Sequence, residues 1–72
     1  MFSSQNNRRV MSFGEALIGV AKGGLITKLE WGDETIYGFI DNGILKLHRS
    51  DGTEHNWIVS DGDIVGEDFI IL

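Results

Sequence analysis

The chain has 72 residues, 42% of them hydrophobic and 24% charged, and it contains no cysteine and no proline. This composition is typical of one folded domain, because the length leaves no room for a second core and the apolar content is too high for a disordered chain. A formal net charge of −5 with only six Lys and Arg argues against a nucleic acid polymer as partner, and the missing cysteine excludes disulfides and fits a cytoplasmic protein.

The N-terminal segment 1–11 shows no apolar periodicity, which predicts a flexible tail followed by a single domain over 12–72. A pair of arginines before the apolar stretch 10–21 resembles an export signal. Glu15 interrupts that stretch, however, and it is too short to span a bilayer. We therefore expect a cytoplasmic protein that is not associated with a membrane.

A helix is predicted over 13–22. Ser12 and Glu15 have the spacing of a capping box, in which each side chain accepts a hydrogen bond from a backbone N–H of the first turn. Apolar residues then recur at the spacing of one buried stripe, at Phe13, Ala16, Leu17, Val20 and Ala21. Gly23 supplies a C-terminal stop.

Alternating side chains predict four strands in the middle of the chain, over residues 25–31, 35–40, 44–49 and 53–59. The pair Asn42-Gly43 favours a two-residue type I′ turn between the second and third of them. Asp51-Gly52 repeats this turn chemistry before the fourth strand. The last three of these strands are therefore expected to form an antiparallel meander.

The C-terminal part begins with Ser60, which is expected to cap one short helical turn before Ile64 and Val65. Residues 69–72 are apolar and predict a final strand that covers a sheet edge. The predicted fold is therefore α+β, with one N-terminal helix packed on a small antiparallel sheet, a short C-terminal helical turn and a final strand.

If both turns have two-residue loops, the register divides the side chains of the meander between two faces. The aliphatic face, suited to pack on the helix, holds Ile36, Gly38, Ile40, Leu45, Leu47 and Ile58. The other face is aromatic and mildly basic and holds Tyr37, Phe39, Lys46, His48, His55 and Trp57. Such a face suits either a nucleobase with its phosphate or a second subunit, and both hold if a ligand binds where subunits meet.

Motifs for catalysis and metal binding do not stand out. No glycine-rich phosphate loop precedes a helix, and the acidic residues of 61–68 do not have the offsets of a calcium loop. His48 and His55 are expected to be cross-strand neighbours, but a zinc site needs further protein ligands. No activated nucleophile or carboxylate pair is recognisable. We therefore expect no enzyme, no metal and no cofactor.

Three groups of residues carry a family resemblance over almost the whole chain after Val10. The first opens the helix and comprises Met11, Phe13, Gly14, Glu15, Ala16 and Leu17. The second is a basic residue before a Trp-Gly pair, Lys28 before Trp31 and Gly32. The third comprises Trp57, Ser60, Asp63, Ile64, Val65 and Asp68. In these positions the chain resembles the Thoeris anti-defence sponge family of small phage proteins, with Gly66 and Phe69 where the family usually has Ala and Trp.

The resemblance implies an oligomeric protein of the infected bacterial cell that sequesters a cyclic nucleotide immune signal without cleaving it. The signal would be of the cyclic ADP-ribose type or a cyclic dinucleotide. A homo-oligomer, dimer or tetramer, is also expected because so short a chain without disulfides or metal has a marginal core. A second hypothesis is an acidic protein-interaction module that inhibits a host protein. A third is an enzyme that hydrolyses the signal.

The expected ligand site combines aromatic rings for stacking, an ammonium for phosphate, and polar groups for a base edge or ribose hydroxyl. Its predicted members are Lys28, Trp31, Tyr37, Asn56, Trp57 and Ser60. For the two tryptophans, packing in the core is the alternative role.

Overall fold

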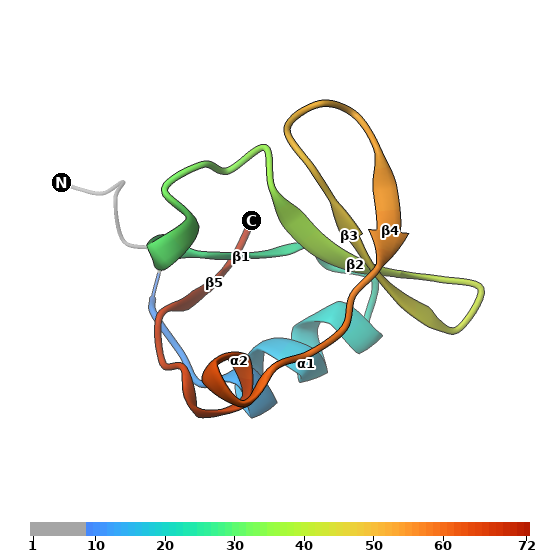
Figure 1. Ribbon diagram of the computed structural model, residues 1–72. Helices are drawn as coiled ribbons and strands as arrows, with labels where there is room; N and C mark the ends of the chain where they lie inside the picture. The colour runs from blue at the N-terminus through green and yellow to red at the C-terminus, as the bar shows by residue number, and fades with distance from the viewer. Residues whose placement is uncertain (1–8) are drawn as a thin grey trace, which may run out of the picture.

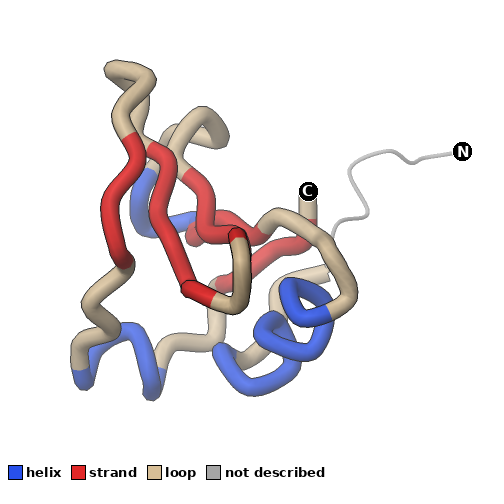
Figure 2. Tube along the Cα trace, turned by 90° about the vertical axis from the view of Figure 1, so that its right-hand side faces the viewer, coloured by secondary structure: helices blue, strands red, loops and turns tan. Residues whose placement is uncertain are grey.

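The computed structural model describes residues 9–72. Its helices are α1 (Phe13–Ala21), the 3₁₀ turn η1 (Leu29–Trp31) and α2 (Asp61–Val65), and its strands are β1 (Ile26–Lys28), β2 (Tyr37–Asp41), β3 (Ile44–His48), β4 (Glu54–Asn56) and β5 (Phe69–Ile71). The strands form one antiparallel sheet in the order β4-β3-β2-β1-β5. Both α-helices lie below the strands in two perpendicular views (Figures 1 and 2). The predicted α+β fold is therefore confirmed.

The predicted capping box starts α1. Ser12 Oγ accepts a hydrogen bond from the Glu15 backbone N–H at 3.2 Å, and Glu15 Oε1 accepts one from the Ser12 N–H at 3.1 Å. The helix ends one residue before the predicted Lys22, and Gly23 follows with a φ of 97°, in the left-handed region that favours glycine. α1 packs on β1, β2 and β5, so it covers one end of the sheet.

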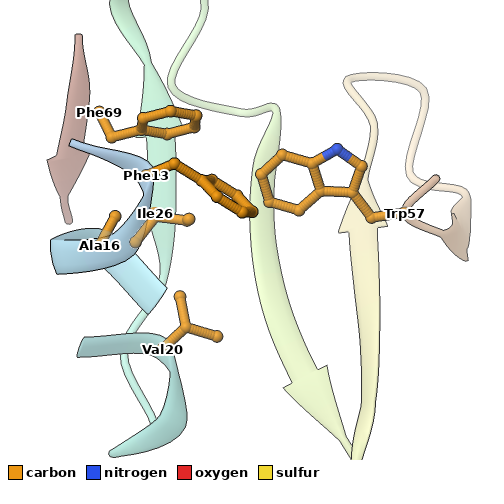
Figure 3. Close-up of a cluster of buried hydrophobic side chains, with 6 residues drawn as sticks. All are labelled: Phe13, Ala16, Val20, Ile26, Trp57 and Phe69. Atoms are coloured by element: carbon orange, nitrogen blue, oxygen red, sulfur yellow. The ribbon is translucent and has the colours of Figure 1, made fainter. Parts of the chain in front are cut away.

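The core lies between α1 and the sheet (Figure 3) and comprises Phe13, Ala16, Val20, Ile26, Trp57 and Phe69. The Phe13 ring lies 5.3 Å from that of Phe69 and 5.9 Å from that of Trp57, measured between centroids. Gly38 makes room for the indole, because a Cβ at this position would lie 2.3 Å from a carbon of the Trp57 ring.

The hairpin of β2 and β3 has the predicted register. Ile40 lies opposite Leu45, and Tyr37 lies opposite His48. The turn residues Asn42 and Gly43 have φ values of 53° and 79°, as a type I′ turn requires. The Asn-Gly pair therefore determined both the turn and the pairing of these strands.

The predicted register of the next hairpin is wrong by one residue. β3 and β4 pair Lys46 with Asn56, whereas a two-residue loop would place Lys46 opposite Trp57. The loop instead has three residues, because Arg49 and Thr53 are joined by a backbone bond of 2.9 Å and Gly52 adopts a φ of 88°. Glycine at this left-handed position is the usual partner of a three-residue loop.

A shift of one residue moves every side chain of a strand to the opposite face. Trp57 and His55 therefore leave the predicted aromatic face, where Asn56 and Glu54 replace them. Trp57 enters the core with 8% of its surface exposed. Ile58, expected on the aliphatic face, is 84% exposed instead.

At the edge of the sheet formed by β1 and β5, the strands are shorter than predicted. The chain bends into η1 after Lys28, so the expected strand to Trp31 stops early. β5 covers the edge of β1 as predicted, with Phe69 opposite Lys28. Met11, predicted in the tail, exchanges two backbone hydrogen bonds with Phe69, at 2.9 and 3.1 Å, and so belongs to the sheet. Residues 1–8 of the predicted tail lie outside the described residues.

Candidate functional site

The six predicted site residues fall into two groups on opposite faces of the sheet. The larger group comprises Lys28, Trp57 and Ser60, which contact the carboxylate of Asp63, and Trp31, whose ring contacts that of Trp57. Tyr37 and Asn56 share the other face, since they lie opposite His48 and Lys46, which are two residues apart in β3.

Asp63 accepts hydrogen bonds from two sides. Its Oδ2 lies 3.3 Å from the indole Nε1–H of Trp57 and 3.1 Å from the backbone N–H of Ser60. The second bond belongs to the capping box of α2, in which Ser60 Oγ accepts the Asp63 N–H at 3.2 Å. The cap thus aims Asp63 at Trp57. Asp63 was not among the predicted site residues, although the Ser-x-x-Asp spacing from Ser60 indicates its place in the cap.

Lys28 reaches the same place from β1 and is almost completely buried. Its Nζ lies 2.6 Å from Glu30 Oε1, 3.8 Å from Asp68 Oδ1 and 4.0 Å from Asp63 Oδ1. The hydrogen bond with Glu30 raises the pKa of the Lys28 ammonium above its usual 10.5, against the opposing effect of burial, and the charges of Asp68 and Asp63 act with Glu30. The ammonium is therefore charged and surrounded by the chain's own anions.

The two indoles of this group differ in accessibility. They meet edge to face, with centroids 5.6 Å apart and planes at 60°. Trp57 is a core residue whose backbone N–H also bonds to Leu45 O at 3.0 Å. Trp31, at the end of η1, is only half-buried. Trp31 is therefore the indole that a planar ligand reaches in this arrangement.

The opposite face of the sheet carries an aromatic group. The rings of Tyr37 and His48 stack with centroids 4.6 Å apart and an interplanar angle of 11°, and Phe39 lies 5.9 Å from Tyr37. His48 Nδ1 lies 3.5 Å from Glu54 Oε2. This aromatic face is turned away from α1, which packs on the side of Gly38 and Ile26.

A small cavity lies between β1, β5 and the loop after η1. Its volume is about 180 Å³, which is below the roughly 300–1,000 Å³ of ordinary ligand pockets. It is lined by Thr27, Lys28, Leu29, Gly32, Asp33, Glu34 and Ile70. Thr27 Oγ1 already donates its proton to Ile36 O at 2.8 Å, so toward a ligand it can act only as an acceptor. A whole nucleotide therefore does not fit inside this cavity.

Residues 9–72 contain no group of three or more His, Asp and Glu side chains placed to hold a metal ion. They also contain no helix with the length and apolarity to cross a membrane. No protein-family model and no curated protein matches the chain.

Proposed function

We propose that this protein binds a cyclic nucleotide, of the cyclic ADP-ribose type or a cyclic dinucleotide, and sequesters it intact in the cytoplasm of an infected bacterial cell. The observation that carries the proposal is the meeting of Lys28, Trp57 and Ser60 around one anion, the Asp63 carboxylate, with the more accessible ring of Trp31 beside that of Trp57. An ammonium, an accessible indole and a serine are the groups that hold a phosphate and a base.

The complete site needs a second copy of the chain. A single chain keeps Tyr37 and Asn56 on the face opposite Lys28, and its cavity of about 180 Å³ is too small for a nucleotide. A contact between copies brings the two faces together and covers the aromatic group of Tyr37, Phe39 and His48. We therefore propose a homo-oligomer, dimer or tetramer, with the ligand at the contact.

Calorimetry with a panel of cyclic ADP-ribose isomers and cyclic dinucleotides tests this function. We expect one member to bind with a Kd below about 10 μM, equivalent to about 7 kcal/mol. Trp31→Ala should lose at least about fivefold in affinity while its fold survives, because one stacked base contributes about 1–3 kcal/mol. Mass spectrometry of the ligand released by denaturation should recover it unchanged. A panel without a binder contradicts the proposal, and a cleaved ligand identifies an enzyme.

A second candidate function is direct inhibition of a basic host protein. From Ser50 to the C-terminus the chain has no Lys or Arg but carries Asp51, Glu54, Asp61, Asp63, Glu67 and Asp68. Within this acidic part Ile58 and Val65 are 84% and 74% exposed. Exposed apolar residues among carboxylates suit a cationic protein surface. Failure of the whole nucleotide panel would favour this alternative.

A further inference from the structure

Residues 58–67, which carry α2, are held to the molecule with little apolar packing. No residue of α2 is buried, and Ile64 and Val65 are 56% and 74% exposed. Within this segment Val59 is the apolar side chain that packs against the core. Since apolar burial is the main force that fixes an element to a core, the segment depends on its polar contacts.

Both ends of the segment are firmly attached. At one end the Trp57 backbone N–H donates to Leu45 O at 3.0 Å, beside the buried indole. At the other end Asp68 O accepts from the Leu29 N–H at 3.0 Å, and Phe69 pairs with Lys28 in the sheet. Any local opening is therefore confined to the residues between these two anchors.

Asp63 makes the side-chain contacts that join α2 to those anchors. Its carboxylate faces Lys28 Nζ at 4.0 Å and accepts from Trp57 Nε1 at 3.3 Å, and both groups lie outside 58–67. The helix has little stability of its own, because it has five residues and Gly62 is one of them. Loss of the Asp63 contacts thus releases the helix from Lys28 and Trp57.

We infer that residues 58–67 form a cover over Lys28 and Trp57, that Asp63 is the latch of this cover, and that a ligand phosphate replaces the Asp63 carboxylate when the cover opens. The identity of the ligand rests on the proposed function, whereas the opening itself does not. A phosphodiester and a carboxylate each carry one negative charge, so the exchange leaves the charge around Lys28 unchanged while Glu30 and Asp68 stay in place.

Hydrogen exchange measured by NMR without ligand tests the opening. The reporters are the Trp57 indole N–H and the Ile64 amide, which donates to Ser60 O at 3.0 Å. Both should show the same protection factor, at least about tenfold lower than that of the Ala16 amide of α1, because both are exposed by the same local opening. If the Trp57 indole N–H is as strongly protected from exchange as the Ala16 amide, the inference is overturned.

Two variants change the cover in opposite directions. Gly62→Ala is sterically compatible with the structure, because the contact found for the new Cβ is Ser60 Oγ at 3.8 Å. It should slow the hydrogen exchange of both reporters about fivefold, because alanine stabilises α2. Asp63→Asn should speed the hydrogen exchange of both reporters about tenfold, because it removes the charge that faces Lys28. Asp61→Asn is the matched control, since it removes the same charge from an exposed position of the same helix. It should leave the exchange rate of the Trp57 indole N–H within about twofold of the parent's. If Gly62→Ala leaves the exchange of the Trp57 indole N–H unchanged, the inferred cover is overturned, even if Asp63→Asn fails to fold.

Adenosine 3′,5′-cyclic monophosphate, a phosphodiester with one negative charge, is the probe for the exchange of anions. Titration should shift the Trp57 indole resonance, and Asp63→Asn should bind the probe at least about fivefold more tightly than the parent because the competing carboxylate is gone. Equal affinity, or no binding to either protein, overturns the exchange. The outcome of the cyclic nucleotide panel does not affect the hydrogen-exchange result, so failure of the proposed function and failure of the cover are distinguishable.

Discussion

At the scale of single residues, the most constrained position is Gly38. Its missing side chain leaves the space that the Trp57 ring fills, and the ring is in turn held by contacts with Phe13 and Phe69. The glycine is therefore needed for close packing and not for a turn. Trp57 combines two roles, because its ring belongs to the core and its N–H to the Asp63 site.

Gly38→Ala should destabilise the protein by about 1–3 kcal/mol, since the new Cβ would lie 2.3 Å from the indole and the core must shift. Urea denaturation measures the free energy of unfolding. Gly14→Ala is the matched control, because no atom lies within 4 Å of a Cβ at that helical position, and it should be neutral or slightly stabilising. Equal stability of the two variants would contradict this account of Gly38.

At the scale of elements, Lys28 connects three separate parts of the chain. Its ammonium contacts Glu30 in η1, Asp63 in α2 and Asp68 just before β5. Asp68 adds a hydrogen bond from the Glu30 N–H to its Oδ2 at 2.9 Å. A buried ammonium with these partners costs desolvation but specifies where the C-terminal segment lies.

The alkaline stability of the protein should depend on Lys28. Because the pKa of its ammonium is raised above 10.5 in the folded state, the contribution of the cluster is fully present below that value and is lost as pH rises through the folded pKa. We therefore expect the free energy of unfolding to fall as pH rises above 10.5. In Lys28→Met this fall should be smaller, and the variant should be about 1–3 kcal/mol less stable at neutral pH. The same alkaline fall in both proteins would contradict the prediction.

At the scale of the whole molecule, α1 and α2 lie on one side of the strands (Figure 1). The aromatic face of Tyr37, Phe39 and His48 lies on the side of the sheet away from α1. Chains of this length bury a smaller fraction of their surface than longer chains do, and association adds to their stability. The stacked Tyr37 and His48 with Phe39 offer a rigid surface for a second copy. The proposed ligand site requires the same contact.

Light scattering should therefore give a mass that is a multiple of 8.0 kDa at micromolar concentration. Phe39→Lys should dissociate the oligomer, because it places an ammonium within the aromatic face. Ile18→Lys, which introduces the same charge at a position of α1 that is 60% exposed, on the other side of the sheet, should keep the parental mass. A monodisperse parental monomer refutes the proposed assembly.

Removal of residues 1–10 should leave the melting temperature and ligand binding unchanged, because this part of the sequence lacks apolar periodicity and the Ser12 cap can start α1 without it. A longer truncation that also removes Met11 and Ser12 should cost at least about 1 kcal/mol, the contribution of a typical cap. Calorimetric melting compares the two truncations. A loss of that size from the shorter truncation would show that residues before Met11 contribute to the fold.

The sequence by itself determined the features that arise from neighbouring residues. The capping box at Ser12, the Asn42-Gly43 turn, the cap at Ser60 and the final strand depend on a few adjacent side chains, and all are present in the structure. Such features follow from backbone preferences and local hydrogen bonds, so a short window of sequence contains them. The helix stripe likewise identified Phe13, Ala16 and Val20 as core residues.

Only the tertiary structure decided the register of β4 and the composition of the site. Two- and three-residue loops are both compatible with Asp51-Gly52, and the choice between them moved Trp57 from a surface face into the core. The choice agrees with packing, because Gly38 in a distant strand leaves space for that ring. The contacts of Lys28 with Asp63 and Asp68 also join residues 35 and 40 positions apart, so no local pattern specifies them. The fold brings them together because β5 pairs with β1 and carries the acidic segment to the buried ammonium.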